Sequence, residues 1–228
     1  MVIDRTVASA VRLLHARNAA RTEPELIRCG GREWELLPGV FSPALDESTE
    51  IFCSMLLSRR FESFIDIGCG AGVVGLSVAL ELGAKVTCSD ISTAAVENTR
   101  LNARRHGLAA VSIQQGDFLE PVGDVRNASV FWNSAFIDAA PAVEDDLTNA
   151  FYDPGYHAHR RFFNQCGRTR GAIREVIVGF SSAGRPDVLL EIAGANRFDL
   201  VNRETRSSAK QAGLTYDMYT FQKEQKWH

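Results

Sequence analysis

Three glycines alternate with small residues directly after an apolar run, in the stretch Asp66-Ile67-Gly68-Cys69-Gly70-Ala71-Gly72. Because glycine has no Cβ, it allows positive φ angles and lets a ligand approach the backbone closely. Apolar residues at helical spacing follow from Val73, so the pattern predicts a strand, a tight turn and a helix. The unpaired N–H groups and the positive dipole end of that helix would face whatever lies over the turn. The stretch therefore predicts a cofactor site.

Two cofactor chemistries fit these glycines. Residues 70–75 (GAGVVG) match the G-x-G-x-x-G pattern of nicotinamide and flavin sites, with Asp90 at about the distance expected for a ribose contact. Residues 66–72 instead resemble the D-x-G-x-G-x-G signature of class I S-adenosylmethionine-dependent methyltransferases. An aspartate is out of place in the buried apolar strand before a dinucleotide fingerprint, whereas it suits a loop facing a zwitterionic methionine tail. We favour S-adenosylmethionine. By this resemblance its methionine part lies over Asp66, Gly68, Gly70 and Gly72.

Two further acids follow successive apolar runs. Asp90 ends the run Lys85-Val86-Thr87-Cys88-Ser89-Asp90, where a carboxylate can accept both hydrogen bonds of a ribose diol, and Ile91 next to it can cover one adenine face. After the next run, Asp117 and Phe118 resemble the family's acidic loop, whose carboxylate takes the adenine amino group. Each acid is also consistent with a turn or capping role. Their joint placement after successive strands favours cofactor binding.

A fourth apolar run ends in Asn133-Ser134-Ala135-Phe136, where the family carries the signature N-P-P-F/Y. That signature belongs to methyltransferases that act on amide or amine nitrogens of planar groups. By the resemblance, Asn133 accepts the N–H hydrogens and Phe136 stacks on the target plane, so both are catalytic candidates, and Asn133 also borders the cofactor. Ser134 and Ala135 replace the two prolines, so the rigid geometry that proline imposes is expected to be lost.

Substrate-pocket candidates come from two segments. The run Leu37-Pro38-Gly39-Val40-Phe41-Ser42-Pro43 resembles the segment before the glycine motif in release-factor glutamine methyltransferases and their relatives. By that resemblance Phe41 and Ser42 line the methyl-donor end of the cofactor, although Phe41 is equally consistent with a core role. Residues 138–158 read as a long loop, which is typical of a substrate lid. We expect its polar and aromatic cluster to face the substrate: Tyr152, Asp153, Tyr156 and His157.

The elements that must position these residues alternate between apolar strands and helices. They predict an α/β fold, doubly wound, with a mostly parallel seven-stranded sheet and an antiparallel last strand, as in class I methyltransferases. Residues 1–20 read as an amphipathic helix, and residues 26–37 as two short strands about Gly30-Gly31, forming either part of a lid or ordinary framework. We expect an N-terminal helix and β-ribbon cap at 1–44 and an S-adenosylmethionine-binding, Rossmann-like catalytic domain at 45–228.

Composition narrows the class of protein further. The 228 residues are 45% hydrophobic with a net charge of −3, so nucleic acid is an unlikely partner. No apolar run is long enough for a membrane span, and the start does not read as a signal peptide. The five cysteines form no C-x-x-C pair, so we expect neither a metal site nor a disulfide framework. A cytoplasmic protein is expected.

The predicted reaction is methyl transfer from S-adenosylmethionine to a nitrogen of a small or peptidic substrate. The altered N-P-P-F stretch leaves two alternatives. One resembles the azetidine-2-carboxylate synthases, in which the cofactor's own amine attacks its γ-carbon and expels methylthioadenosine, so that no second substrate is needed. The other is a cofactor-binding partner subunit that catalyses nothing, but Asn133 at the end of an apolar strand argues against it, because its amide must be satisfied there.

Overall fold

A computed structural model of the chain describes residues 5–123, 125–141, 145, 147–169 and 173–224, with residues 5–8 and 10 as backbone only. In chain order the elements are α1 (Arg5–Ala19), β1 (Glu25–Cys29), β2 (Arg32–Leu36), α2 (Ser48–Leu57), β3 (Ser63–Ile67), α3 (Val73–Leu82), β4 (Lys85–Asp90), α4 (Thr93–Arg105), β5 (Ser112–Gln115), β6 (Ser129–Asn133), the 3-10 turns η1 (Thr148–Ala150) and η2 (Pro154–Tyr156), α5 (His157–Arg168), β7 (Glu175–Ser181), α6 (Pro186–Ala195), β8 (Phe198–Ser207) and β9 (Thr215–Lys223). The predicted first helix is confirmed from Arg5 onward, and residues 1–4 of that prediction lie outside the described part.

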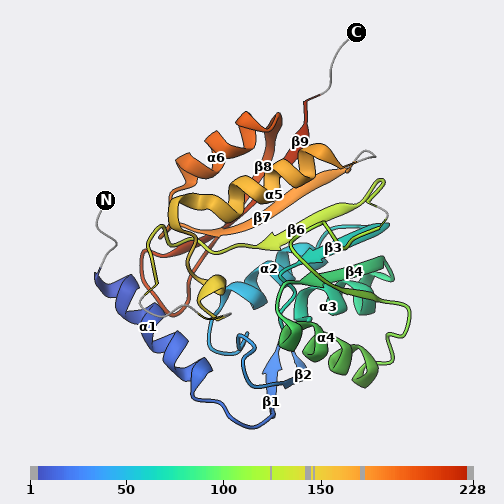
Figure 1. Cartoon of the computed structure of the whole chain (residues 1–228), viewed down its shortest axis with the longest axis vertical. Helices are drawn as coiled ribbons and strands as arrows, with labels where there is room; N and C mark the ends of the chain where they lie inside the picture. The colour runs from blue at the N-terminus through green and yellow to red at the C-terminus, as the bar shows by residue number, and fades with distance from the viewer. Residues whose placement is uncertain (1–4, 124, 142–144, 146, 170–172, 225–228) are drawn as a thin grey trace.

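Seven strands form one sheet in the order β5-β4-β3-β6-β7-β9-β8 (Figure 1). The pairs β3–β4, β3–β6, β4–β5 and β6–β7 are parallel. β9 runs antiparallel to both β7 and β8. The predicted doubly wound sheet with an antiparallel last strand is therefore confirmed. The chain leaves β3 toward β4 on one side and returns to β6 on the other, so the carboxyl ends of β3 and β6 flank the point where the strand order reverses.

Both faces of the sheet are covered by helices, because parallel strands with apolar residues at successive positions must be buried on two sides. Phe162 and Phe163 of α5 pack with Val130 and Val178 on one face, together with residues of α6. On the other face, residues of α2 and α3 pack against Phe64, Phe131 and Ile177 of the strands. The two aromatic-rich layers hold the strand ends, and thus the loops that follow them, in fixed relative positions.

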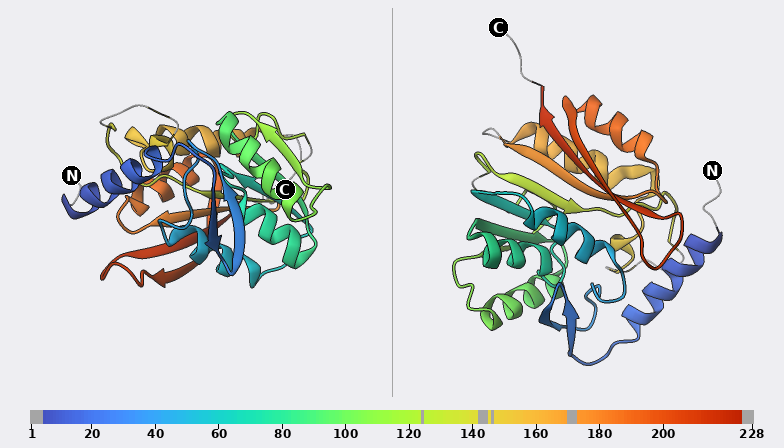
Figure 2. Two further views of the ribbon diagram at one scale, coloured as in Figure 1. Left: turned by 90° about the horizontal axis from the view of Figure 1, so that it is seen from below. Right: turned by 180° about the vertical axis from the view of Figure 1, so that it is seen from behind.

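The N-terminal ribbon of β1 and β2 is framework. Its Trp34 and Leu36 are fully buried against residues of α3 and α4. Two buried asparagines of α4 hold its second strand, since Asn102 Oδ1 accepts the N–H of Glu35 and Asn98 Oδ1 accepts that of Leu37, both at 2.8 Å. Figure 2 shows the ribbon at the end of the molecule opposite the C-terminus. The division of the chain into residues 1–44 and 45–228 stays a prediction.

The segment between β6 and α5 is more ordered than a plain loop. It contains η1 and η2 and a parallel bridge between Ile137 and Tyr152. Val11 of α1 packs on Ile137 and Phe151, and His15 lies 2.8 Å from an Asp145 carboxylate oxygen. Residues 142–144 and 146 of the predicted lid lie outside the described part. Helix α1 therefore supports the outer side of this segment.

Candidate active site

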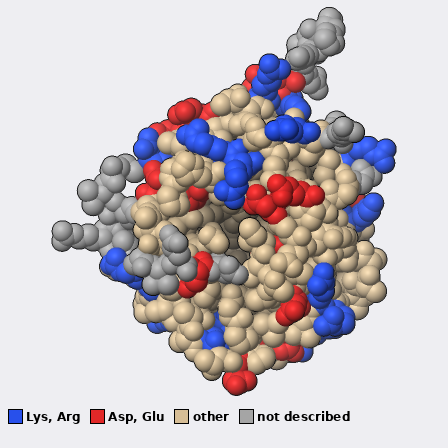
Figure 3. All heavy atoms as spheres, in the orientation of Figure 1, with Lys and Arg blue, Asp and Glu red and all other residues tan. Residues whose placement is uncertain are grey.

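A cavity of about 280 Å³ opens at the carboxyl ends of β3, β4 and β6. Figure 3 shows it as a hollow near the centre of one face, with basic side chains above it and acidic side chains beside it. Ten of the predicted site residues line it: Phe41, Asp66, Gly68, Gly70, Asp90, Ile91, Asp117, Phe118, Asn133 and Phe136. The cavity lies where a doubly wound fold binds ligands, at the reversal of strand order.

The glycine turn is bent around the end of β3. Gly68 and Gly70 have φ angles of 64° and 56° and line the cavity. Gly72, also at positive φ, does not line it, which corrects the prediction for this residue. A Cβ on Gly72 would lie 2.9 Å from the Thr99 side chain, so this glycine instead allows α3 and α4 to pack closely. The turn thus offers backbone at Gly68 and Gly70, while Gly72 serves the framework.

Asp66 lies within strand β3 and is 3% exposed, so its prediction as a loop residue was wrong. The carboxylate points under α3, where Oδ2 accepts the backbone N–H of Gly75 at 2.8 Å. Burial, and to a smaller extent the charge of nearby Asp90, raises the pKa of Asp66 to about 7, against the opposing effect of this hydrogen bond. An acid is tolerated in an apolar strand here because it satisfies a free N–H in the first turn of a helix.

Asp90 stands at the end of β4 with both carboxylate oxygens engaged. Oδ2 accepts the N–H of Gly70 and Oδ1 accepts that of Ser92, each at 2.9 Å. The carboxylate therefore joins the glycine turn to the start of α4. Each carboxylate oxygen can accept more than one hydrogen bond. Ile91, next in the chain, is 56% exposed at the cavity wall.

Asp117 and Phe118 lie between β5 and β6 and contact α5. The carboxylate of Asp117 accepts hydrogen bonds from Arg161 at 3.2 and 3.3 Å and from Gln165 at 3.3 Å. The Arg161 guanidinium also lies over the Phe118 ring, 5.5 Å from its centroid. Helix α5 thus fixes the acid predicted to bind adenine, and a bound amino group would share that carboxylate with Arg161.

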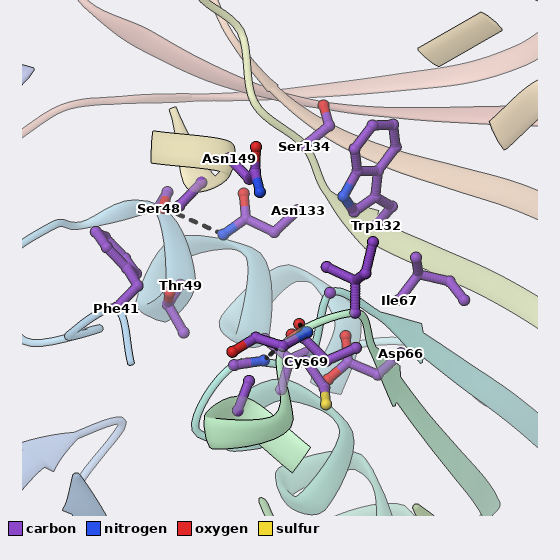
Figure 4. A pocket seen from close by; sticks show the side chains of 18 of the residues that line it. Phe41, Ser48, Thr49, Asp66, Ile67, Cys69, Trp132, Asn133, Ser134 and Asn149 are labelled. Atoms are coloured by element: carbon purple, nitrogen blue, oxygen red, sulfur yellow. Dashed lines mark hydrogen bonds between the residues drawn. The ribbon is translucent and has the colours of Figure 1, made fainter. Parts of the chain in front are cut away.

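Asn133 reaches the cavity from the last residue of β6. Its Nδ2 donates to Ser48 Oγ at 3.3 Å, and among the described residues Oδ1 has no hydrogen-bond partner. Figure 4 shows the amide between Ser48 of α2 and Asn149 of η1. Phe136 is half-buried in the wall of the same cavity. The cavity thus holds both an amide oxygen and an aromatic ring, contributed by residues three positions apart in the chain.

The two residues that replace the family's prolines are tightly held. Ser134 is 4% exposed, and both its N–H and its hydroxyl donate to the carbonyl of Gly179 in β7, at 3.0 and 2.9 Å. Ala135 is 3% exposed. A proline at position 134 would lack that N–H. The expected loss of rigidity is therefore corrected, because hydrogen bonds to the neighbouring strand take over the restraint.

Several predicted substrate residues lie behind the cavity. Asp153 is 2% exposed and caps α5 by accepting the N–H groups of Ala158 and His159, and it also lies 2.6 Å from His159 Nδ1. Burial acts to raise the pKa of Asp153, but these hydrogen bonds hold it below its ordinary value. Burial lowers the pKa of His159, against the effect of Asp153. The pair is a carboxylate with a neutral imidazole that donates through Nδ1.

Tyr156 is also structural. It is 1% exposed, and its hydroxyl donates to the carbonyl of Phe136 at 3.0 Å and accepts the N–H of Arg185 at 2.8 Å. The other three predicted pocket residues also lie outside the cavity: Tyr152 packs near α1, His157 is exposed and Ser42 is buried with its N–H bound to Asn18 Oδ1. A loop rich in polar and aromatic residues here builds the start of a helix instead of a substrate surface.

The cavity has lining residues that the sequence analysis did not assign to a site, among them Ser48, Trp132, Asn149, Arg161, Phe180 and Tyr216. For two of these residues, the only indication of a site role was their position in the sequence. Trp132 directly precedes Asn133, and Ser48 begins the helix after the segment that contains Phe41. The other four residues come from segments that are distant in the sequence and meet only in the folded chain.

The described residues contain no group of three or more His, Cys, Asp or Glu side chains arranged to hold a metal ion. All five cysteines are buried and unpaired. In the described part of the chain, no helix is both long and apolar enough to cross a membrane.

The sheet order, the glycine turn and the acids after β4 and β5 define a class I S-adenosylmethionine-dependent methyltransferase, as predicted. The chain belongs to the family described as Methyltransferase small domain, which matches residues 33–158. The predicted fold, enzyme class and cofactor are thereby confirmed, and the nicotinamide or flavin alternative gains no support.

Three known proteins illustrate the similarity. A release factor glutamine methyltransferase of Moorella thermoacetica is 37% identical over 123 residues, covering 50% of this chain and 43% of that protein. A ribosomal RNA small subunit methyltransferase C of Haemophilus influenzae is 41% identical over 66 residues, covering 28% and 20%. The solved structure of a T. thermophilus 16S rRNA N2 methyltransferase with AdoMet and guanosine has a TM-score of 0.59 and 19% identity, covering 88% and 50%. The chain spans less than half the length of either curated relative.

Proposed function

We propose that this chain transfers the methyl group of S-adenosylmethionine to a nitrogen atom of a planar amide or amine. The observation that carries the proposal is the amide of Asn133, held by Ser48 at the cavity with its Oδ1 available and with Phe136 in the same wall. A cavity with an acceptor oxygen and an aromatic ring in its wall suits a planar group that carries N–H hydrogens.

The proposed cofactor contacts follow the cavity from one end to the other. Asp117 and Phe118 bind the adenine end with Ile91 over it, Asp90 accepts the ribose hydroxyls, and the backbone of Gly68 and Gly70 lies under the methionine part. This assignment is supported by the cavity wall, because all these residues line it. Asp66 contributes from below by fixing the first turn of α3.

When bound, the sulfonium supplies an already activated methyl group. The protein's own task is then to place an unprotonated nitrogen in line with that group and to exclude water. Asn133 Oδ1 would accept one acceptor N–H and so turn the nitrogen lone pair away from the amide. Phe136 would restrict the acceptor plane. Ser134, which is hydrogen-bonded to β7, and the buried Ala135 would hold both groups in place.

The acceptor class is open to both protein and RNA. One curated relative is named for methylation of a release factor glutamine and another for ribosomal RNA, so the expectation that nucleic acid is an unlikely partner is not supported. A glutamine side chain and an exocyclic base amine share the chemistry that the site requires: a planar nitrogen beside a conjugated system. The alternatives of intramolecular cyclisation and of a non-catalytic partner subunit gain no support from the relatives.

The test compares Asn133→Ala with Asn164→Ala, an exposed asparagine of α5 outside the cavity. Release of S-adenosylhomocysteine is measured with a glutaminyl tripeptide, with guanosine and with small primary amines, while calorimetry checks cofactor binding. We expect Asn133→Ala to keep binding but to lower turnover by about a hundredfold, because the acceptor loses its orienting partner. Asn164→Ala should match the parent. Equal turnover in the two variants would contradict the role of Asn133.

A further inference from the structure

Trp132 is locked in the wall of the cavity. It is 7% exposed and packs among the rings of Phe118, Phe162 and His159, with centroid distances of 5.0, 5.0 and 4.6 Å. His159 is itself fixed by its contact with Asp153. The indole therefore cannot turn without displacing an aromatic cluster, because interiors are packed at crystal-like density.

The polar edge of this indole faces the glycine turn. A Cβ built on Gly68 would lie 3.5 Å from Trp132 Nε1 and 3.6 Å from Cδ1. Figure 4 shows the nitrogen turned toward the cavity, near Ile67 and Asn133. Among the described residues, Nε1 has no hydrogen-bond partner, and it is open to the cavity that Trp132 lines, since it is not one of the buried atoms left without a partner. A tryptophan N–H in a largely buried position ordinarily finds an acceptor.

Trp34 provides the internal contrast. It is fully buried in the N-terminal ribbon, and its Nε1 donates to the carbonyl of Cys29 at 3.0 Å. The framework tryptophan is thus satisfied by its own chain, whereas Trp132 faces a cavity with its donor free. A ligand that fills the cavity covers this N–H, and because an unmade hydrogen bond at a buried donor is costly, a ligand that supplies an acceptor there is favoured.

We infer that Trp132 is a cofactor-binding residue whose indole N–H donates a hydrogen bond to an acceptor atom of bound S-adenosylmethionine. This rests on the proposed function, since it assigns a contact to the same cofactor. The acceptor is either an oxygen or nitrogen of the nucleoside half or an oxygen of the amino-acid tail. The locked ring provides the donor in a fixed place, so no side-chain entropy is lost on binding.

The first test follows the indole N–H signals of the parent protein. Protein labelled with nitrogen-15 has three tryptophans, of which Trp227 lies outside the described residues. Their indole N–H signals are assigned with the variants Trp132→Phe and Trp34→Phe. On saturation with S-adenosylhomocysteine, the Trp132 signal should move to lower field and its exchange with water should slow. The Trp34 signal should stay in place.

The second test is calorimetry of S-adenosylhomocysteine and methylthioadenosine binding to the parent and to both variants. Trp132→Phe keeps an aromatic ring but removes the donor, so affinity for S-adenosylhomocysteine should fall by about tenfold. Trp34→Phe should bind like the parent. The same loss with methylthioadenosine, which lacks the amino-acid tail, places the acceptor in the nucleoside half, and no loss places it in the tail.

The inference is overturned if the Trp132 signal is unchanged at saturation and Trp132→Phe binds as tightly as the parent. In that case the parent still binds the nucleoside, and the proposed function stands. If the parent binds neither S-adenosylhomocysteine nor S-adenosylmethionine, the proposed function itself fails and the inference with it.

Discussion

Replacing Asp66 by asparagine should change how the stability of the protein depends on pH. The carboxyl is 3% exposed, and burial raises its pKa from 3.8 to about 7. The folded state therefore holds this proton more tightly than the unfolded state does. The resulting stabilisation is complete below about pH 4 and is lost as the pH rises through about 7. Above that pH, the buried carboxylate remains charged and adds no further slope.

The magnitude follows from these two values. Well between these two values, each pH unit lowers the free energy of unfolding by about 1.4 kcal/mol, and the loss is about 3 kcal/mol between pH 5 and pH 8 because the slope falls off near pH 7. An asparagine at this position can still accept the Gly75 N–H through its amide oxygen but carries no titrating proton. The unfolding free energy of Asp66→Asn minus that of the parent should therefore rise by about 3 kcal/mol as the pH goes from 5 to 8.

The assay is urea unfolding of the parent and the variant at four pH values from 5 to 8, with the difference in unfolding free energy plotted against pH. Taking the difference removes contributions common to both proteins, including that of buried His159. Asp199→Asn on the exposed face of β8 is the matched control, because it makes the same substitution at a position without burial. A flat or falling difference for Asp66→Asn would mean that Asp66 is ionised throughout, which refutes the reasoning.

Two further outcomes are expected. A Cβ on Gly75 would lie 2.7 Å from Cys88 Sγ and 3.0 Å from Asp66, so Gly75→Ala should destabilise the fold by about 1–3 kcal/mol, whereas Gly194→Ala in open space on α6 should stabilise it slightly. Urea midpoints that rank the two variants in the other order would contradict the packing of α3. Asp90→Ala removes a carboxylate proposed to bind the ribose, so calorimetry should show S-adenosylhomocysteine binding weakened by about tenfold or more. Unchanged affinity would remove Asp90 from the site.

Much of the fold was predictable because local patterns agreed with one another. Apolar runs separated by helical spacing predicted the sheet, and the positions of Gly68, Asp90 and Asp117 after successive runs predicted one cavity, as the structure shows. These residues follow strands in the chain. Once parallel strands are aligned, their carboxyl ends must meet at one edge, so sequence position alone determines the grouping.

The remaining site depended on contacts between distant segments. Asp153 and Tyr156 lie in a segment with the composition of a binding loop. Their side chains are nevertheless buried, where they form hydrogen bonds to α5 and to the residue before α6. Asp66 interrupts the apolar pattern of β3 because its carboxylate accepts the N–H of Gly75, nine residues later in the chain. The apolar run before Asn133 gave no sign that Trp132 would turn its N–H edge to a cavity, because that orientation is set by rings from α5 and from residue 118.

The most direct test of methyl transfer to a separate acceptor follows both nucleoside products at once. The parent protein is incubated with S-adenosylmethionine alone and then with the glutaminyl tripeptide, guanosine or primary amines, and the products are separated by chromatography. We predict S-adenosylhomocysteine only when an acceptor is present, with the methyl group on an acceptor nitrogen, and loss of this product in Asn133→Ala. Methylthioadenosine that accumulates from S-adenosylmethionine alone would contradict this account.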